Sequence, residues 1–267
     1  MKNKIIIIPD IHGRDFWKSA LDDIKNGVRT IFLGDYHDPY KHENISKQDS
    51  INNFKEIIEI ANKYSNVELL LGNHDFGYIH PEICSSRRDY ENYEVISKLF
   101  EDNKHLFKIC TIYKDVLISH AGVHQDWLIE VFYPEIETVE DVIKIPLDKI
   151  HDDINKLLED EEHLVESLNV VGMSRGGRGL YGSPVWCDIS EHWNNDLPFK
   201  QIVGHSMQCH GFYDDNFRVH YKWGLPIQYG EYDQVTCIDC YRIFELNEDE
   251  LGIELTIYNS NEYLAIL

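Results

Sequence analysis

Polar side chains that can bind metal ions gather at five places in the sequence, each directly after a short apolar run. Carboxylate, amide oxygen and imidazole groups together form a ligand set that suits Mn²⁺, Fe or Zn²⁺ better than Ca²⁺ or Cu⁺. Each cluster also contains a glycine, which allows the backbone to turn sharply there. The five clusters are DIHG at 10–13, GDYHD at 34–38, GNHD at 72–75, SHAG at 119–122 and GH at 204–205.

The apolar runs that precede these clusters have the length and composition of β-strands. They cover 4–9, 29–33, 67–71, 116–119 and 202–203. Apolar spacing predicts helices between them, over 14–24, over 47–64 with Ser46 as N-cap, and over 93–100. This alternation indicates a parallel sheet, and ligands bind beyond the carboxyl ends of such strands. We therefore expect the five clusters to share one metal site.

The rest of the chain is predicted to form further short strands within the same domain. A strand is predicted over 106–113, and others over 218–221, 235–238, 241–246 and 254–258. The Gly- and Arg-rich stretch 170–184 is predicted to be a long loop. The whole pattern predicts an α/β fold, a four-layer αββα sandwich of two mixed β-sheets flanked by helices. We expect residues 1–267 to form a single domain.

Charge and hydropathy restrict the possible partners and location. The chain has 267 residues and a net charge of −22, from 25 Lys and Arg against 47 Asp and Glu. Binding a long nucleic acid requires cations that neutralise phosphates, so no such partner is expected. Part of the acidity lies on a helical pattern over 147–168, between apolar residues. No apolar run has the length of a membrane span and none resembles an export signal, so we expect a cytoplasmic protein without a membrane partner.

The D-x-H-G and GD-x-x-D clusters alone are weak signals, because an Asp or His after a strand often belongs to a turn, and GNHD alone is a moderate one. In combination, the order D-x-H, GD-x-x-D, GNH-D, H and GH resembles the calcineurin-like metallophosphoesterase superfamily, over about residues 5 to 205. Met207 stands where many members have a second His after the last motif. The single His205 is similar to the phosphoprotein-phosphatase branch and its bacterial and phage relatives.

The resemblance implies two divalent metal ions, with Mn²⁺ as the first expectation and Fe or Zn²⁺ as alternatives. Such a pair supplies a bridging hydroxide that attacks phosphorus. His74 would then protonate the leaving oxygen as a general acid, oriented by Asp38. The implied ligands are Asp10, His12 and Asp35 for the first ion, and the bridging Asp35 with Asn73, His120 and His205 for the second.

The sequence departs from the eukaryotic-type protein phosphatases at the arginine that binds phosphate. Those enzymes have Arg-Gly after the second Asp of the GD-x-V-D motif, whereas Pro39 and Tyr40 follow Asp38 here. A guanidinium elsewhere could contact two phosphate oxygens at once. The candidates are Arg87 and Arg88 after the GNHD motif and, favoured by their glycine-rich loop, Arg175 and Arg178.

These features predict a metal-dependent phosphatase that hydrolyses phosphate monoesters and is similar to serine/threonine phosphatases. The substrate would be a phosphorylated small molecule, a nucleotide or a phosphoprotein. A phosphodiesterase or dinucleoside-polyphosphate hydrolase is the alternative among enzymes, and it would need an open groove for a second substituent. A non-catalytic metal-binding scaffold is the alternative from another class, although a scaffold has no use for a general acid such as His74.

Overall fold

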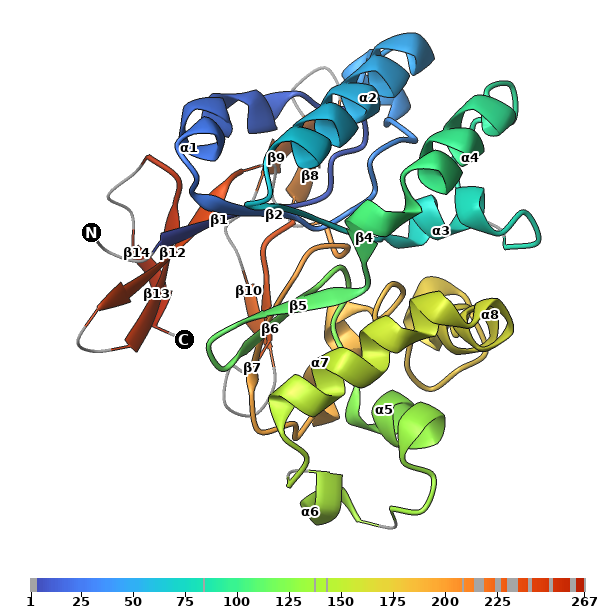
Figure 1. Ribbon diagram of the computed structural model, residues 1–267, viewed down its shortest axis with the longest axis vertical. Coiled ribbons are helices and arrows are strands. Elements are labelled where there is room, and N and C mark those ends of the chain that lie inside the picture. The colour runs from blue at the N-terminus through green and yellow to red at the C-terminus, as the bar shows by residue number, and fades with distance from the viewer. Residues whose placement is uncertain are drawn as a thin grey trace.

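The fold contains two β-sheets that face each other, with helices on the outer side of both (Figure 1). A computed structural model describes residues 4–83, 85–136, 138–142, 144–207, 209–213, 219–223, 227–229, 235–239, 242–249, 252–259 and 263–266. Strands β8 (Cys209–Tyr213) and β9 (Val219–Trp223) form a separate antiparallel hairpin.

The first sheet has seven strands in the order β14-β13-β12-β1-β2-β3-β4. The strands from β1 to β4 are parallel, and β12 to β14 add antiparallel neighbours on the other side of β1. A parallel strand covered on both faces is apolar throughout, as the run of four isoleucines in β1 shows. The strands are β1 (Lys4–Ile8), β2 (Arg29–Phe32), β3 (Val67–Leu70), β4 (Phe107–Lys108), β12 (Phe244–Asp249), β13 (Gly252–Ile257) and β14 (Tyr263–Ile266).

The second sheet has five strands in the order β10-β11-β7-β6-β5. Strand β7 pairs in parallel with both β6 and β11, and the outer strands are antiparallel to their neighbours. The sheet is therefore mixed, as the first one is. Its strands are β5 (Cys110–Tyr113), β6 (Val116–Ser119), β7 (Lys200–Val203), β10 (Ile227–Tyr229) and β11 (Val235–Cys237).

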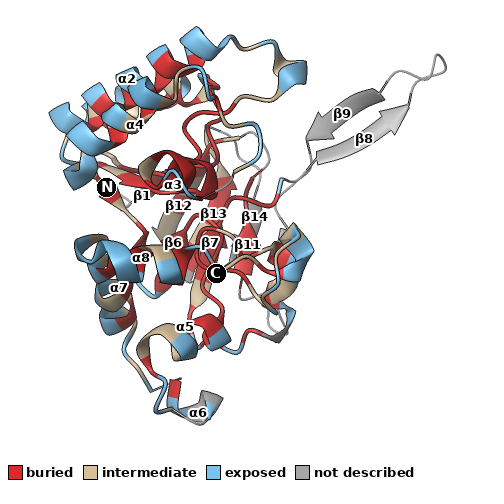
Figure 2. Ribbon diagram, turned by 90° about the vertical axis from the view of Figure 1, so that its right-hand side faces the viewer, coloured by how far each residue is buried: buried red, intermediate tan, exposed pale blue. Residues whose placement is uncertain are grey.

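The longer helices keep one face on a sheet and the other in solvent, so buried and exposed residues alternate along them (Figure 2). Helices α1 to α4 belong to the first sheet, and α5 to α8 cover the second (Figure 1). They are α1 (Leu21–Lys25), α2 (Lys47–Lys63), α3 (Asn73–Ile79), α4 (Tyr93–Asp102), α5 (Gln125–Phe132), α6 (Val139–Val142), α7 (Leu147–Lys156) and α8 (Glu161–Leu168).

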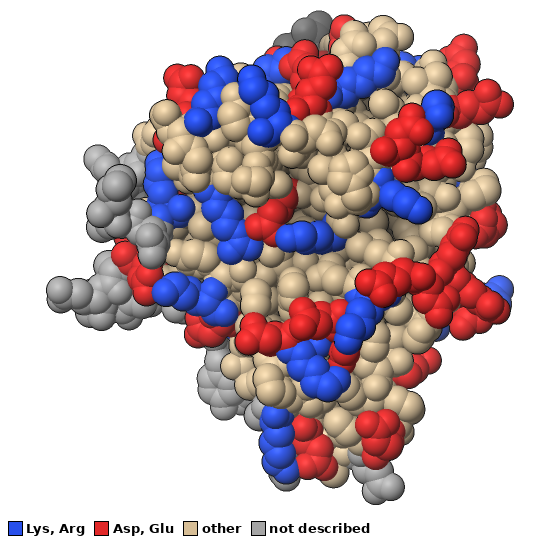
Figure 3. Space-filling model, in the orientation of Figure 1, with Lys and Arg blue, Asp and Glu red and all other residues tan. Residues whose placement is uncertain are grey.

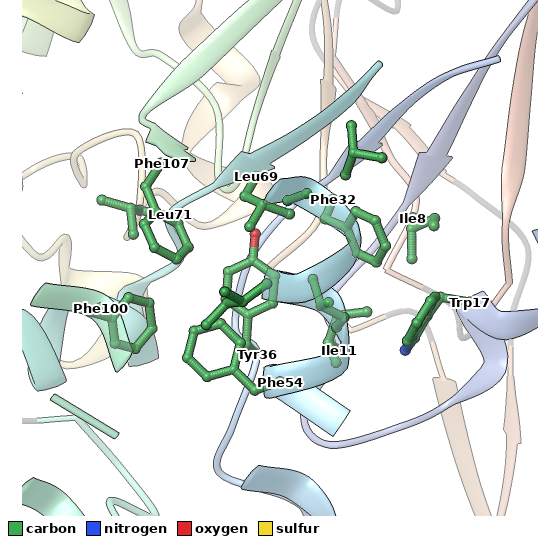
Figure 4. Close-up of a cluster of buried hydrophobic side chains, with 14 of the residues drawn as sticks. Ile8, Ile11, Trp17, Phe32, Tyr36, Phe54, Leu69, Leu71, Phe100 and Phe107 are labelled. Carbon is green, nitrogen blue, oxygen red and sulfur yellow. The ribbon is translucent and has the colours of Figure 1, made fainter. Parts of the chain in front are cut away.

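Three large apolar clusters hold these layers together. One lies between the sheets and includes Ile7, Ile31 and Ile118. A second lies between the first sheet and its helices, where aromatic rings such as Phe54 and Phe100 gather (Figure 4). A third joins the second sheet to α5, α7 and α8. Each fully buried side chain of this size contributes about 1.5–3 kcal/mol. The predicted four-layer αββα sandwich is confirmed.

The predicted strand over 106–113 is wrong as a single element. The structure divides it at Ile109, so that β4 belongs to the first sheet and β5 to the second. Asn155 of α7 accepts hydrogen bonds at its Oδ1 from the backbone N–H of Ile109 at 2.9 Å and of Cys110 at 3.4 Å. The break in the strand therefore does not leave these amides unpaired. A continuous apolar run carries no sign of such a change of sheet.

Two helical predictions also need correction. The segment 14–24 begins as a 3₁₀ turn (Phe16–Ala20) and becomes α1 only at Leu21. The pattern over 147–168 is interrupted at Asp160, whose backbone is extended and whose side chain accepts from the His163 N–H to cap α8. The predicted cap of α2 is confirmed, since Ser46 Oγ accepts from the Asp49 N–H at 3.0 Å.

The surface carries the acidic excess that the composition requires. Acidic side chains gather over α8, while basic ones are scattered between them (Figure 3). Among the described residues, none of the helices combines the length and the apolar character that a membrane span requires.

Candidate active site

The five polar clusters meet between the two sheets, beyond the ends of β1, β2, β3, β6 and β7. The loop after β1 lies along the loop after β2, because the His12 N–H donates to the Asp35 carbonyl at 2.6 Å and the Gly13 N–H to the Tyr36 carbonyl at 3.1 Å. The loop after β7 joins them where the His205 N–H donates to the Asp10 carboxylate at 3.0 Å. Backbone hydrogen bonds thus fix the distances between the predicted ligands.

The Asp35 carboxylate lies at the centre of this site. Its Oδ2 is 3.4 Å from His12 Nε2 on one side and 3.7 Å from His120 Nε2 on the other. Its Oδ1 accepts from the backbone N–H of His74 at 2.9 Å. Asp35 belongs to both groups of side chains that could hold a metal ion in the described part of the chain, with His12 and His74 in one group and Asp10 and His120 in the other.

Two of the histidines are oriented as metal ligands require. His12 Nδ1 is 3.0 Å from the His37 carbonyl, and His120 Nδ1 is 2.9 Å from the Leu33 carbonyl. Because a carbonyl accepts only, each Nδ1 carries the proton and each Nε2 keeps its lone pair toward Asp35. A metal-binding imidazole usually donates its other N–H in this way.

The second half of the site contains Asn73, His120 and His205. His120 Nε2 lies 3.1 Å from Asn73 Oδ1 and 3.1 Å from His205 Nδ1. The Nε2 atom of His205 is buried and has no hydrogen-bond partner among the described residues. Burial lowers the pKa of His205 and of His12 well below the usual range, so both are neutral and able to bind metal at pH 7. These residues fit a divalent ion.

Five of the site residues have a left-handed backbone that non-glycine residues rarely adopt. Their φ angles are 42° for His12, 53° for Asp35, 59° for Asp38, 59° for Arg87 and 62° for His205. Each such conformation costs of order 1–3 kcal/mol and persists only where the surroundings impose it. The strain is concentrated where the predicted ligands lie.

His74 and Asp38 form a buried pair beside the central carboxylate. His74 is the second residue of α3, and its Nδ1 is 2.7 Å from Asp38 Oδ2. With Nδ1 bonded to the carboxylate, Nε2 is the atom that can exchange a proton with a ligand in the cleft. The rings of His74 and His12 meet edge to face at 5.1 Å. The structure therefore brings together every residue that the sequence predicted as metal ligand or general acid.

A cleft of about 330 Å³ opens above these residues. Its lining combines predicted metal-site residues with aromatic and basic side chains: His12, Asp35, Asn73, His74 and His205, together with Tyr40, Ser86, Arg87, Arg175 and Trp186. Asp10, Asp38 and His120 are buried beneath. The cleft is large enough for a phosphate group with part of its substituent.

Two of the four predicted arginines reach the cleft. The Arg87 guanidinium is stacked 3.8 Å from the Tyr40 ring centroid, and its Nη2 is 3.3 Å from His74 Nε2. Arg175 pairs with Asp188 at 2.7 Å and donates to Ser206 Oγ at 2.8 Å. By contrast, Arg88 donates to the Pro81 carbonyl and Arg178 is exposed, so neither lines the cleft.

Asp75 is a residue of the site whose role was not predicted from the sequence. Its buried carboxylate accepts from three backbone N–H groups, those of Asp35 at 2.7 Å, Gly72 at 2.8 Å and Tyr36 at 2.9 Å. It therefore ties the loop after β2 to the start of α3. The signal in the sequence was its place three residues after Gly72 at the beginning of a helix, where an acidic side chain commonly caps the backbone.

Replacing Asp75 by alanine is expected to destabilise the fold and to disturb the site. The three N–H groups would be left buried without an acceptor, so we expect the free energy of unfolding to fall by about 2–5 kcal/mol. Urea unfolding in the presence of a chelator measures this directly. Asp102→Ala is the control, because Asp102 is an exposed partner of Lys98 and should cost less than about 0.5 kcal/mol. Equal stability of the two variants would contradict the role given to Asp75.

Comparison with known proteins identifies the family. The family model for calcineurin-like phosphoesterases matches residues 3–209, and the chain belongs to this family. It is a metal-dependent phosphoesterase, a hydrolase, as the motifs predicted. No curated protein matches the chain.

Solved structures agree with the fold. One is a cold-active protein tyrosine phosphatase solved at 1.1 Å, which is 15% identical over 98% of this chain and 79% of that chain, with a TM-score of 0.54. Another is the cold-active protein-tyrosine phosphatase of a psychrophilic Shewanella species, 14% identical over 98% of this chain and 80% of that one, with a TM-score of 0.52. At this identity the similarity concerns the fold.

Proposed function

We propose that this chain hydrolyses phosphate monoesters at a site that holds two divalent metal ions. The observation that supports this most strongly is the Asp35 carboxylate lying between the Nε2 atoms of His12 and His120, at 3.4 and 3.7 Å. A carboxylate with imidazoles on both sides is suited to bridge two ions. The proposed ligands are Asp10, His12 and Asp35 for one ion, and Asp35, Asn73, His120 and His205 for the other, with Mn²⁺ as the first choice of metal.

The metal ions and the side chains would have different roles in the reaction. When bound, two divalent ions lower the pKa of a coordinated water and neutralise charge on the phosphoryl oxygens. His74 donates a proton from Nε2 to the leaving oxygen, while Asp38 accepts the N–H at Nδ1 and keeps the ring in that orientation.

The charges around the cleft favour a monoester over a diester. A monoester near neutral pH carries up to two negative charges, and a diester carries one. Arg87 and Arg175 place two guanidinium groups along the cleft that could interact with the additional charge. A phosphodiesterase is therefore an alternative outcome of the ester comparison described below.

The arginine proposal gives a specific prediction. Arg87→Ala is expected to reduce kcat/KM by about 10- to 100-fold, because a hydrogen bond to a charged group is worth about 1.5–3 kcal/mol. Arg87→Lys should recover little, since a lysine can neither stack on Tyr40 in the same way nor bind two oxygens. Steady-state kinetics with p-nitrophenyl phosphate measure the effect. Arg178→Ala is the control, and an equal loss in both variants would contradict a special role for Arg87.

The preference for monoesters is tested by comparing p-nitrophenyl phosphate with its bis-ester, each with Mn²⁺ and with chelator. We expect chelator-sensitive turnover of the monoester in excess of the diester. Preference for the diester would indicate a phosphodiesterase. Metal binding without hydrolysis of either ester would favour the non-catalytic scaffold.

The proposed class of physiological substrates is broader than these test esters. We propose a phosphorylated small molecule, nucleotide or phosphoprotein, and the titles of the solved structures make phosphotyrosine peptides a useful part of a first screen. Long nucleic acids are not proposed, because the net charge of −22 repels them. Location in the cytoplasm and organisation as one domain stay predictions.

A further inference from the structure

The hydroxyl of Tyr78 contacts the proposed proton-donating pair directly. Tyr78 lies one helical turn after His74 in α3, on the same face of the helix, and is fully buried. It donates a hydrogen bond to Asp38 Oδ1 at 2.5 Å, while Asp38 Oδ2 bonds His74 Nδ1 at 2.7 Å. Both carboxylate oxygens of Asp38 are therefore held by side chains of one helix.

The same hydroxyl also holds the loop that carries Arg87. Its oxygen accepts from the backbone N–H of Asp89 at 2.8 Å. Asp89 is buried and pairs with Lys47 Nζ at 2.7 Å. Two residues before it, Arg87 donates from Nε to the Asp38 carbonyl at 3.2 Å. One hydroxyl group thus joins the carboxylate behind His74 to the arginine loop at the side of the cleft.

Packing alone explains the ring of Tyr78 but not its oxygen. The ring stacks with Tyr93 at 5.7 Å and with Phe100 at 6.5 Å between centroids. A phenylalanine would make the same ring contacts without a polar atom that needs partners. Burial and the Asp38 charge raise the pKa of Tyr78 well above its usual value, so the hydroxyl keeps its proton and donates to Asp38.

We propose that Tyr78 is a positioning residue for the proton transfer, whose hydroxyl keeps Asp38 directed at His74. This inference rests on the proposed function, in which His74 is the general acid. Asp38 has a left-handed backbone, with φ of 59°, and depends on its partners to keep that conformation. Removal of the hydroxyl frees one carboxylate oxygen and lets Asp38 rotate away from His74.

The test uses the dependence of general-acid catalysis on the leaving group. Phenolate has a conjugate acid with a pKa of about 10, as for tyrosine, and needs a proton to leave, whereas p-nitrophenolate leaves more easily without one. Tyr78→Phe is expected to lower kcat for phenyl phosphate about 10-fold or more, and for p-nitrophenyl phosphate by a clearly smaller factor. A purely structural loss would lower both rates equally.

Tyr93→Phe is the matched control, because Tyr93 belongs to the same aromatic cluster and its hydroxyl donates to the Tyr78 carbonyl, at 3.3 Å, and to no other group among the described residues. We expect this variant to keep the wild-type ratio of the two rates. In a His74→Asn background, Tyr78→Phe should have almost no further effect on either ester, since its action passes through His74. Bound metal per chain should equal that of the wild type in all folded variants.

Three results would overturn either the positioning role of Tyr78 or the proposed function, and each result shows which of the two is wrong. An active wild type whose two rates fall equally in Tyr78→Phe would overturn the positioning role alone. The same holds if the full loss persists in the His74→Asn background. An inactive wild type would overturn the proposed function and this inference with it. If Tyr78→Phe does not fold, 4-aminophenylalanine at this position keeps the ring and an N–H donor. Wild-type rates on both esters are then expected, and a loss of either rate despite the retained donor is the contrary result.

Discussion

Replacement of His74 by asparagine is expected to reduce kcat for monoester hydrolysis by about 10²- to 10⁴-fold while bound metal stays at the wild-type level. The reason is geometric. His74 Nδ1 is bonded to Asp38 at 2.7 Å, and the ring lines the cleft, so Nε2 alone can deliver a proton to the leaving group. An asparagine preserves the bond to Asp38 but cannot donate a proton from an acidic nitrogen.

The control for this prediction is His124→Asn. His124 is buried as well, yet it lies at the N-terminus of α5, where its Nδ1 accepts from the Asp126 N–H at 3.2 Å. An asparagine can replace it as a cap, so activity should stay within about twofold. Unchanged activity in His74→Asn would refute its assignment as general acid. Lost activity with retained metal would argue against a non-catalytic scaffold.

Replacement of Asp35 by asparagine is expected to have the largest effect on metal binding. Even groups that only orient a metal ligand are worth about 10–100-fold in metal affinity, so loss of a bridging carboxylate should cost at least about 10²-fold. Wild-type stability should rise by about 2.7 kcal/mol when free Mn²⁺ is 100 times its Kd. The variant should show almost none of this gain at the same Mn²⁺ concentration.

Without metal, Asp35→Asn should lower the free energy of unfolding at most by the contribution of the hydrogen bonds that it loses. The reason is that it also removes a negative charge that lies near Asp10. Urea unfolding with Mn²⁺ and with chelator separates the two effects. Asp126→Asn, on the exposed start of α5, is the control and should keep the full stabilisation by Mn²⁺. Equal stabilisation of Asp35→Asn by Mn²⁺ would contradict the bridging role.

Much of the fold could be predicted because its signals are local. The isoleucine run of β1 and the helical spacing of α2 with its Ser46 cap are properties of short segments. The division between β4 and β5 could not be predicted, because it depends on contacts of Ile109 and Asn155 that are 46 residues apart. The break at Asp160 does have a local cause, since aspartate is a good N-cap, but the acidic residues around it obscured that signal.

The site was easier to predict than its surroundings. Metal-ligand types at strand ends follow from chemistry and topology, and the structure brings all of them together. The arginines were harder, because Arg87 and Arg88 are adjacent in the sequence and their side chains point to different partners. The role of Tyr78 and the bonds of Asp75 to the loop after β2 join segments about 40 residues apart, which neither spacing nor residue type reveals; only the bond of Asp75 to Gly72 has a local signal.

We propose that hydrolysis requires two metal ions held around Asp35. The most direct test is to titrate metal-free protein with Mn²⁺ and to measure bound metal per chain together with hydrolysis of p-nitrophenyl phosphate. We expect binding to saturate at two ions per chain and activity to appear in step with occupancy of the site. Full activity in metal-free protein, or saturation with metal at wild-type level in Asp35→Asn, would contradict it.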